Sequence, residues 1–271
     1  MGITVEMPGG KGILVTNPLR EPSELERMTL PADATAAATL VEERLAHVIA
    51  AVRLIIEKLD GKVPLIGFSA APWTLFYYMV GGSSKKGQEE GERWLREYPE
   101  ASARILDALQ LIVIEYMSAQ ATAGAHMLQL FEAMGEFITP ASMEAEALPR
   151  MTAIAAALKA RHPDVPLMVF PRGAAYALPQ LGESGFDVLT LDASADWDTV
   201  RTELPPVCLQ GAFDPKVLID GDEAAVVAGV EQMLDKLGSQ KLIANLCEGL
   251  SGKEKPELVN AFVEAVHAYK K

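Results

Sequence analysis

Aromatic and charged side chains gather in the segments that directly follow short apolar runs of this sequence. Phe68 and Phe131 each end such a run, and Arg172 and Asp192 follow two others. If the runs are parallel strands, their carboxyl ends meet at one edge and these side chains share a cleft. Aromatic walls with charges of both signs suit a flat, apolar ligand with polar edges. The residues alone leave a second interpretation open, in which Phe68 and Phe131 are core and Trp73 anchors a loop.

The residue types that bind metals are too scattered to predict a metal site. The four histidines lie far apart in the chain, and none belongs to a His-x-Cys or His-Glu-x-x-His pattern. Cys208 and Cys247 are isolated, which fits a reducing compartment better than a disulfide framework.

The elements that must position these residues alternate along the chain. The expected strands are residues 63–68, 126–132, 166–170, 187–192, 207–211 and 241–246. The expected helices are residues 36–59, 102–120, 142–161, 175–181, 223–237 and 256–269. Apolar strands that alternate with amphipathic helices predict parallel βαβ units. No Gly-x-Gly-x-x-Gly opens a helix, so a dinucleotide-binding fold has little support.

The pattern favours an α/β fold of the (β/α)8 TIM-barrel type that lacks its first one or two strand-helix units. Six strands are expected where such a barrel has about eight. Residues 1–35 offer only the short strand candidates "ITVEM" and "GILVT", with no crossover helix between them. We therefore expect residues 1–271 to form a single barrel domain that is incomplete at its N-terminus.

Composition excludes several classes of partner. The net charge is −13, which argues against nucleic acid and against an anionic membrane surface. No segment approaches the ~20 unbroken apolar residues of a membrane helix, so membrane insertion is not expected.

Six motifs resemble the uroporphyrinogen decarboxylase family, and they occur in its order from about residue 1 to residue 270. The most specific is "PLIGFSAAPWTLFYYMVGG", which is similar to the family signature P-L-I-G-F-x-G-A-P-W-T-L-x-x-Y-M-x-E-G. The others are "PGGKGILVTNPLR", "GAHMLQLFE", "MVFPRGA", "LQGAFDPKVL" and "IANLCEGL".

The resemblance implies a (β/α) barrel, usually a homodimer, that needs no metal or organic cofactor. The family removes the four acetate carboxyls of uroporphyrinogen to give coproporphyrinogen, in haem and chlorophyll synthesis. By this likeness Phe68 and Phe131 line the cleft, Tyr78 is the substrate-contacting tyrosine, and Arg172 faces the cleft. The implied ligand is a tetrapyrrole (porphyrinogen), and the implied compartment is the cytoplasm or the plastid stroma.

The chain departs from the family pattern in the polar half of this site. Ala133 stands where the family has a serine, and Glu248 stands where it has a histidine. An ionised glutamate repels a carboxylate that a histidinium would attract. Ala70, Ala212 and Gly81 replace a glycine, an asparagine and a glutamate of the family motifs. The family's catalytic aspartate and its two carboxylate-binding arginines have no counterpart here.

Three interpretations follow from these departures. In the first, the chain is a fragment or a mis-started version of a functional uroporphyrinogen decarboxylase. In the second, it is a degenerate, weakly active or inactive homologue that acts as a binding or structural subunit, as a homodimer or packed on another protein. In the third, the weakest, it is a relative of the corrinoid-type methyltransferases.

Overall fold

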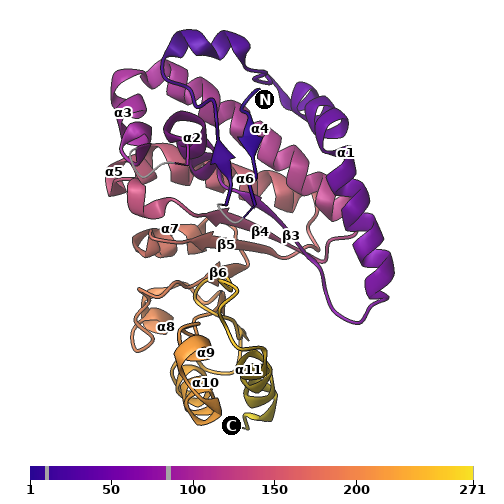
Figure 1. Cartoon of the computed structure of the whole chain (residues 1–271), viewed down its shortest axis with the longest axis vertical. Coiled ribbons are helices and arrows are strands. Elements are labelled where there is room, and N and C mark those ends of the chain that lie inside the picture. The colour runs from indigo at the N-terminus through magenta and orange to yellow at the C-terminus, as the bar shows by residue number, and fades with distance from the viewer. Residues whose placement is uncertain (10–11, 84–86, 271) are drawn as a thin grey trace. The chain divides into compact units, whose positions relative to one another are not determined.

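The computed structural model describes residues 1–9, 12–83 and 87–270, which form two compact units, Met1–Leu167 and Met168–Lys271 (Figure 1). Each unit is described by itself below. Residues 10 and 11 of the motif that begins at Pro8 lie outside the described residues. No helix in the described part of the chain is long and apolar enough to cross a membrane. The single-domain organisation expected for residues 1–271 stays a prediction.

The first unit holds a short antiparallel hairpin and a parallel strand pair. The hairpin is β1 (Val5–Glu6) with β2 (Leu14–Val15), and the parallel pair is β3 (Ile66–Ala70) with β4 (Met127–Glu132). Phe68 lies opposite Gln129 in this register. On β3 the residues Gly67 and Ser69 are buried while Phe68 is exposed, so Phe68 points away from the buried face of the strand.

Helices build the rest of the first unit. They are η1 (Pro22–Arg27), α1 (Ala34–Leu59), α2 (Pro72–Gly81), α3 (Glu90–Glu97), α4 (Pro99–Thr122), η3 (Gly135–Phe137), α5 (Pro140–Ser142), η4 (Met143–Ala147) and α6 (Leu148–Arg161). The Asp33 carboxylate caps α1 by accepting from Ala36 N at 2.8 Å. Figure 1 shows α1 alongside α4, where Ile49 and Val52 pack against Ala123.

The aromatic-rich stretch after β3 is a helix, which corrects the interpretation of Trp73 as a loop anchor. Pro72 occupies the first turn of α2, where its missing N–H costs nothing. Trp73 and Phe76 are fully buried, with ring centroids 5.6 Å apart, and Phe76 meets Trp94 of α3 edge to face at 6.4 Å. The rings therefore form the apolar core that joins α2 to α3.

The second unit carries four parallel strands in chain order. They are β5 (Leu167–Pro171), β6 (Val188–Thr190), β7 (Cys208–Gln210) and β8 (Leu242–Ile243). Its helices are η5 (Ala175–Ala177), α7 (Leu178–Glu183), α8 (Val200–Glu203), α9 (Val217–Asp220), α10 (Glu223–Leu237) and α11 (Pro256–Ala268). Helices α10 and α11 pack against each other. The expected α/β class with parallel strands is confirmed, and each expected strand overlaps an observed one.

Candidate functional site

A cavity of about 790 Å³ lies in the first unit. Five of the residues singled out in the sequence line it together, namely Phe68, Ala70, Tyr78, Phe131 and Ala133. Its walls come from strands β3 and β4, from helices α1, α2 and α4, and from the N-terminal hairpin. Almost all of its lining side chains are apolar, and Arg44 is the only charged side chain among the described residues that line it.

Phe68 and Phe131 form the aromatic wall of this cavity. They stand on the paired strands β3 and β4, with ring centroids 6.0 Å apart and ring planes inclined by 52°. The Phe68 side chain is 59% exposed, whereas the other residues of β3 are buried or half-buried. An aromatic ring held open in a concave apolar surface is typical of a ligand contact. The interpretation of Phe68 as core is therefore wrong.

Glu132 fixes the helix that carries Tyr78. The Glu132 side chain is wholly buried at the end of β4. Its carboxylate accepts from Thr74 N at 3.1 Å and from Met134 N at 2.8 Å, and the Thr74 hydroxyl also donates to it. These bonds place a negative charge in the first turn of α2, where backbone N–H groups have no helical partner. The position of Tyr78 on α2 thus depends on β4.

Gln120 closes the free edge of β3. Its side chain is buried, its Oε1 accepts from Phe68 N at 3.0 Å, and its Nε2 donates to Phe68 O at 3.1 Å. The backbone N–H and C=O of Phe68 point away from β4. Ala71 donates its N–H to Phe131 O of β4, and the backbone groups of successive residues alternate between the two edges of a strand, so those of Phe68 lie at the opposite edge. A Cβ at Gly67 would lie 2.9 Å from Gln120 Oε1, so only glycine leaves room for this side chain.

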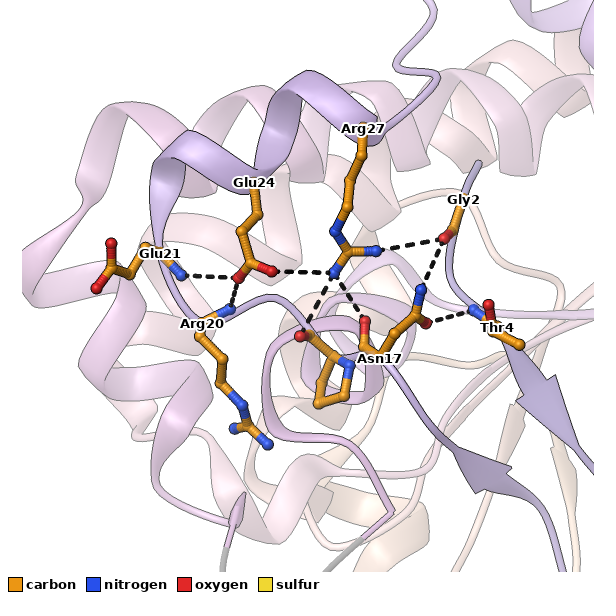
Figure 2. A network of polar contacts seen from close by, with 8 residues as sticks. Gly2, Thr4, Asn17, Arg20, Glu21, Glu24 and Arg27 are labelled. Atoms are coloured by element: carbon orange, nitrogen blue, oxygen red, sulfur yellow. Dashed lines mark hydrogen bonds and ion pairs between the residues drawn. The ribbon is translucent and has the colours of Figure 1, made fainter.

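The N-terminal hairpin supplies one wall of the cavity through Ile3, Val5, Ile13 and Val15. Figure 2 shows the polar network that holds it. Arg27 donates to Asn17 O at 2.8 Å and to Gly2 O at 3.4 Å. Asn17 in turn donates to Gly2 O at 3.3 Å and accepts from Thr4 N. The two strands of the hairpin are therefore tied to η1 through one guanidinium.

Replacing Arg27 with methionine is expected to speed amide hydrogen exchange at Thr4 and Thr16 by about three- to tenfold. The change removes the donors that hold the Asn17 and Gly2 carbonyls, so the hairpin opens locally more often. Exchange measured by mass spectrometry or NMR tests this. Arg20→Met is the matched control, since no hydrogen bond from the Arg20 guanidinium is found in the described residues (Figure 2). Equal exchange in the two variants would contradict the assignment.

Arg172 and Glu248 belong to the second unit and are described with it. Arg172 follows β5 and is half-buried. The neighbouring Gly173 N donates to the Asp192 carboxylate at 2.8 Å, and Ser194 N donates to the same carboxylate at 2.9 Å. Asp192 therefore holds two strand-end loops together.

Glu248 is exposed beside the buried Cys247. Burial, together with the negative charges of Asp214, Glu248 and Asp192, raises the pKa of the Cys247 thiol to about 11. The electrostatic potential at this strand end is therefore negative. Within the described part of the chain, no group of three or more His, Cys, Asp or Glu residues is arranged to hold a metal ion.

Comparison with known proteins places the chain in a family. Residues 1–269 match the uroporphyrinogen decarboxylase (URO-D) family. The uroporphyrinogen decarboxylase of Salinibacter ruber is 39% identical over 270 residues, which cover 99% of this chain and 74% of that protein. The chain belongs to the uroporphyrinogen decarboxylase family. The human member is 37% identical, with 99% of this chain and 73% of that protein covered.

A solved structure shares the fold of this URO-D family chain. A methyltransferase from Methanosarcina mazei superposes with a TM-score of 0.80 over 98% of this chain and 75% of that one. The two sequences are 21% identical, so the likeness concerns the fold alone. With the family membership, it supports the TIM-barrel type of α/β fold expected from the sequence.

Three residues that line or support the cavity were not predicted as site residues from the sequence. Arg44 lines the cavity, while Glu132 and Gln120 position its walls. Glu132 is the last residue of the family-like "GAHMLQLFE" motif, so its place in a motif was the available signal. Gln120 and Arg44 look like ordinary polar residues on amphipathic helices, and no local pattern marks them. Among the histidines, His126 has a structural contact, because its Nδ1 accepts a hydrogen bond from the backbone Leu65 N at 3.0 Å.

Replacing Glu248 with glutamine is expected to raise the alkylation rate of Cys247 at pH 8 by about threefold. Removing a nearby negative charge lowers the thiol pKa, so more thiolate is present at a fixed pH below that pKa. Peptide mass spectrometry after timed iodoacetamide labelling separates Cys247 from Cys208. Glu257→Gln, an exposed position on α11, is the control. No difference between the two variants would show that Glu248 does not act on this strand end.

Proposed function

We propose that this chain binds a porphyrinogen-type tetrapyrrole in the cavity of its first unit and catalyses little or no decarboxylation. The observation that carries the proposal is the open aromatic wall of Phe68 and Phe131 beside Tyr78 and Ala133. Membership of the uroporphyrinogen decarboxylase family supplies the ligand class. The protein is then a degenerate homologue with a binding or structural role.

The apolar walls suit the body of a macrocycle. A porphyrinogen presents four pyrrole rings, and aromatic side chains contact such rings by offset or edge-on packing. Phe68 lines the cavity, and more than half of its surface is exposed, so its ring is accessible to a ligand there. Tyr78 is half-buried and contributes a hydroxyl-bearing ring from α2. Burial of apolar ligand surface against these walls is the driving force for binding.

The polar groups that decarboxylation needs are poorly represented in this cavity. Protonation of a pyrrole creates a cation, and an adjacent carboxylate would stabilise it. None of the described residues that line the cavity is an aspartate or a glutamate. Glu132 lies next to it but is buried and already accepts from Thr74 and Met134. Ala133 lines the cavity without a hydroxyl. Binding without turnover is the expected result.

Two other functions are weaker proposals. In the first, the chain is part of a functional decarboxylase. It covers 72–74% of the length of three relatives, and it would turn over uroporphyrinogen when joined to the remaining part. In the second, the chain is a methyltransferase, for which a fold likeness at 21% identity is the only support.

We also propose that the chain forms a homodimer or a complex with another protein. Light scattering of the purified chain would test this association state.

Titration of the chain with coproporphyrin and uroporphyrin, the stable oxidised forms of the ligands, tests the proposal. We expect saturable binding, and about a tenfold weaker Kd for Phe68→Ala because one aromatic contact is lost. Leu54→Ala is the matched control, since Leu54 is an exposed apolar residue of α1 that does not line the cavity. Absence of binding to the folded wild-type chain would overturn the proposal. An equal loss in both variants would remove the cavity as the site.

A further inference from the structure

Helices α10 and α11 of the second unit pack against each other and leave a hollow of about 550 Å³ beside their contact. A second hollow of about 580 Å³ lies along α10. The two hollows share Glu223, Val227 and Glu231 in their walls. They therefore form one continuous surface feature, called the α10–α11 groove below.

Small apolar residues make up the floor of this groove. Ala224 and Ala228 line it from α10, and Ala261 and Ala265 line it from α11. Each pair is four positions apart, so its members lie on one face of their helix. Side chains this short let another backbone approach closely. Val227 between them is exposed, and covering it would remove apolar surface from water.

Acidic side chains line the same groove. Glu223, Glu231 and Asp235 follow α10 along one face, and Glu264 stands on α11. Lys270 is the one basic side chain among the described residues that line it. Like charges four positions apart on a helix repel each other. The row on α10 is therefore not an arrangement that stabilises the helix by itself.

The negative charge of the groove is not neutralised from within the chain. In the part of the chain that the structure describes, Glu223 and Glu231 make no side-chain hydrogen bond or ion pair. By contrast, the Glu90 carboxylate of α3 lies 2.6 Å from an arginine of its own helix. Lys236 of α10 pairs with Asp198 outside the groove. The two glutamates are thus open to a cationic partner.

We propose that the α10–α11 groove docks a basic amphipathic helix of another protein. Its small residues would face the alanine floor, and its lysine or arginine side chains would meet the carboxylates. Charge complementarity selects this occupant, because the described lining residues carry four carboxylates and one ammonium. A second copy of the chain, paired groove to groove, would bring two acidic rows together.

The dimensions of the groove fit a helical occupant. Glu223 and Asp235 are separated by about 18 Å along α10, at 1.5 Å per residue. Basic residues one or two turns apart on a helix packed along the groove would meet this row. The inference rests on the proposed complex with another protein, to which it gives a surface and a partner class. It does not depend on the ligand of the cavity in the first unit.

Peptide binding to the folded full chain tests the role of the carboxylates. The probe is a synthetic helix of about 18 residues with an alanine–leucine face flanked by lysines, and its neutral counterpart has glutamine for lysine. We expect the double variant Glu223→Gln/Glu231→Gln to weaken the lysine peptide by about five- to tenfold. Glu183→Gln/Glu257→Gln is the control, because it removes the same charge from exposed positions outside the groove.

A second pair of variants tests the floor of the groove and separates docking from general attraction to an acidic protein. Ala228→Trp fills the groove, whereas Ala225→Trp puts the same side chain at an exposed position of α10 outside it. We expect Ala228→Trp to weaken the lysine peptide by about tenfold and Ala225→Trp to leave its affinity within about twofold of wild type. Added salt should weaken the lysine peptide.

The outcomes separate this inference from the proposed function. Equal binding of the lysine and glutamine peptides by the wild type, or equal losses in groove and control variants, would overturn the inference. Self-association that Ala228→Trp abolishes, without peptide binding, would assign the groove to a second copy and would also overturn it. Coproporphyrin binding, measured in the same variants, should not change. Its absence in the wild type would overturn the tetrapyrrole proposal alone.

Discussion

Glu132→Gln is expected to lower the free energy of unfolding by about 3 kcal/mol, a large effect for an isosteric change. The buried carboxylate accepts from Thr74 N, the Thr74 hydroxyl and Met134 N. A glutamine must turn its amide donor toward one of these donors, so a buried N–H loses its partner. It also removes the negative charge that stabilises the first turn of α2.

Urea denaturation followed by circular dichroism measures this change. Glu136→Gln is the matched control, because Glu136 is an exposed glutamate four residues further along the chain. We expect the control to stay within about 0.5 kcal/mol of the wild type. A loss below about 1 kcal/mol for Glu132→Gln would show that the carboxylate does not hold α2.

Gln120→Leu is expected to cost about 2–4 kcal/mol and to promote self-association. The change leaves the N–H and C=O of Phe68 without their side-chain partner, while it keeps nearly the same volume. β4 is the strand that pairs with β3 in the described residues, so the opposite edge of β3 becomes a template for another strand.

Denaturation and size-exclusion chromatography with light scattering test both parts of this expectation. Gln110→Leu on the same helix is the control, because no hydrogen bond of its side chain is found in the described residues. An unchanged free energy of unfolding in Gln120→Leu would contradict the edge-closing role. A variant with a lower free energy of unfolding but an unchanged association state would show that Gln120 stabilises the fold without preventing self-association.

The positions of the main helices and strands follow from periodicity, because long amphipathic segments and short apolar runs differ in both spacing and length. The helix predicted at residues 223–237 agrees with α10, and the helix predicted at residues 36–59 begins two residues after α1 does. Helix α2 escapes this reasoning because it is apolar on all sides. Its signals are Pro72 in the first turn and Gly82 with φ of +74° at the end.

The aromatic part of the site could be predicted, since Phe68 and Phe131 follow from strand ends and Tyr78 follows from the motif. The residues that position them could not. Gln120 reaches Phe68 across 52 positions of the chain, and Glu132 reaches Thr74 across 58. Such contacts depend on which helix packs over which strand, and a local pattern carries no information about that. Arg44 becomes notable only when its apolar surroundings are known.

Anaerobic incubation of the purified chain with uroporphyrinogen tests the central claim most directly, with products separated by their number of carboxyl groups. The chain must first be shown to be folded and to bind coproporphyrin. The account predicts that uroporphyrinogen is recovered unchanged, because no carboxylate among the described lining residues can stabilise a protonated pyrrole. The appearance of products with seven down to four carboxyl groups would contradict it and would assign decarboxylase activity to this chain.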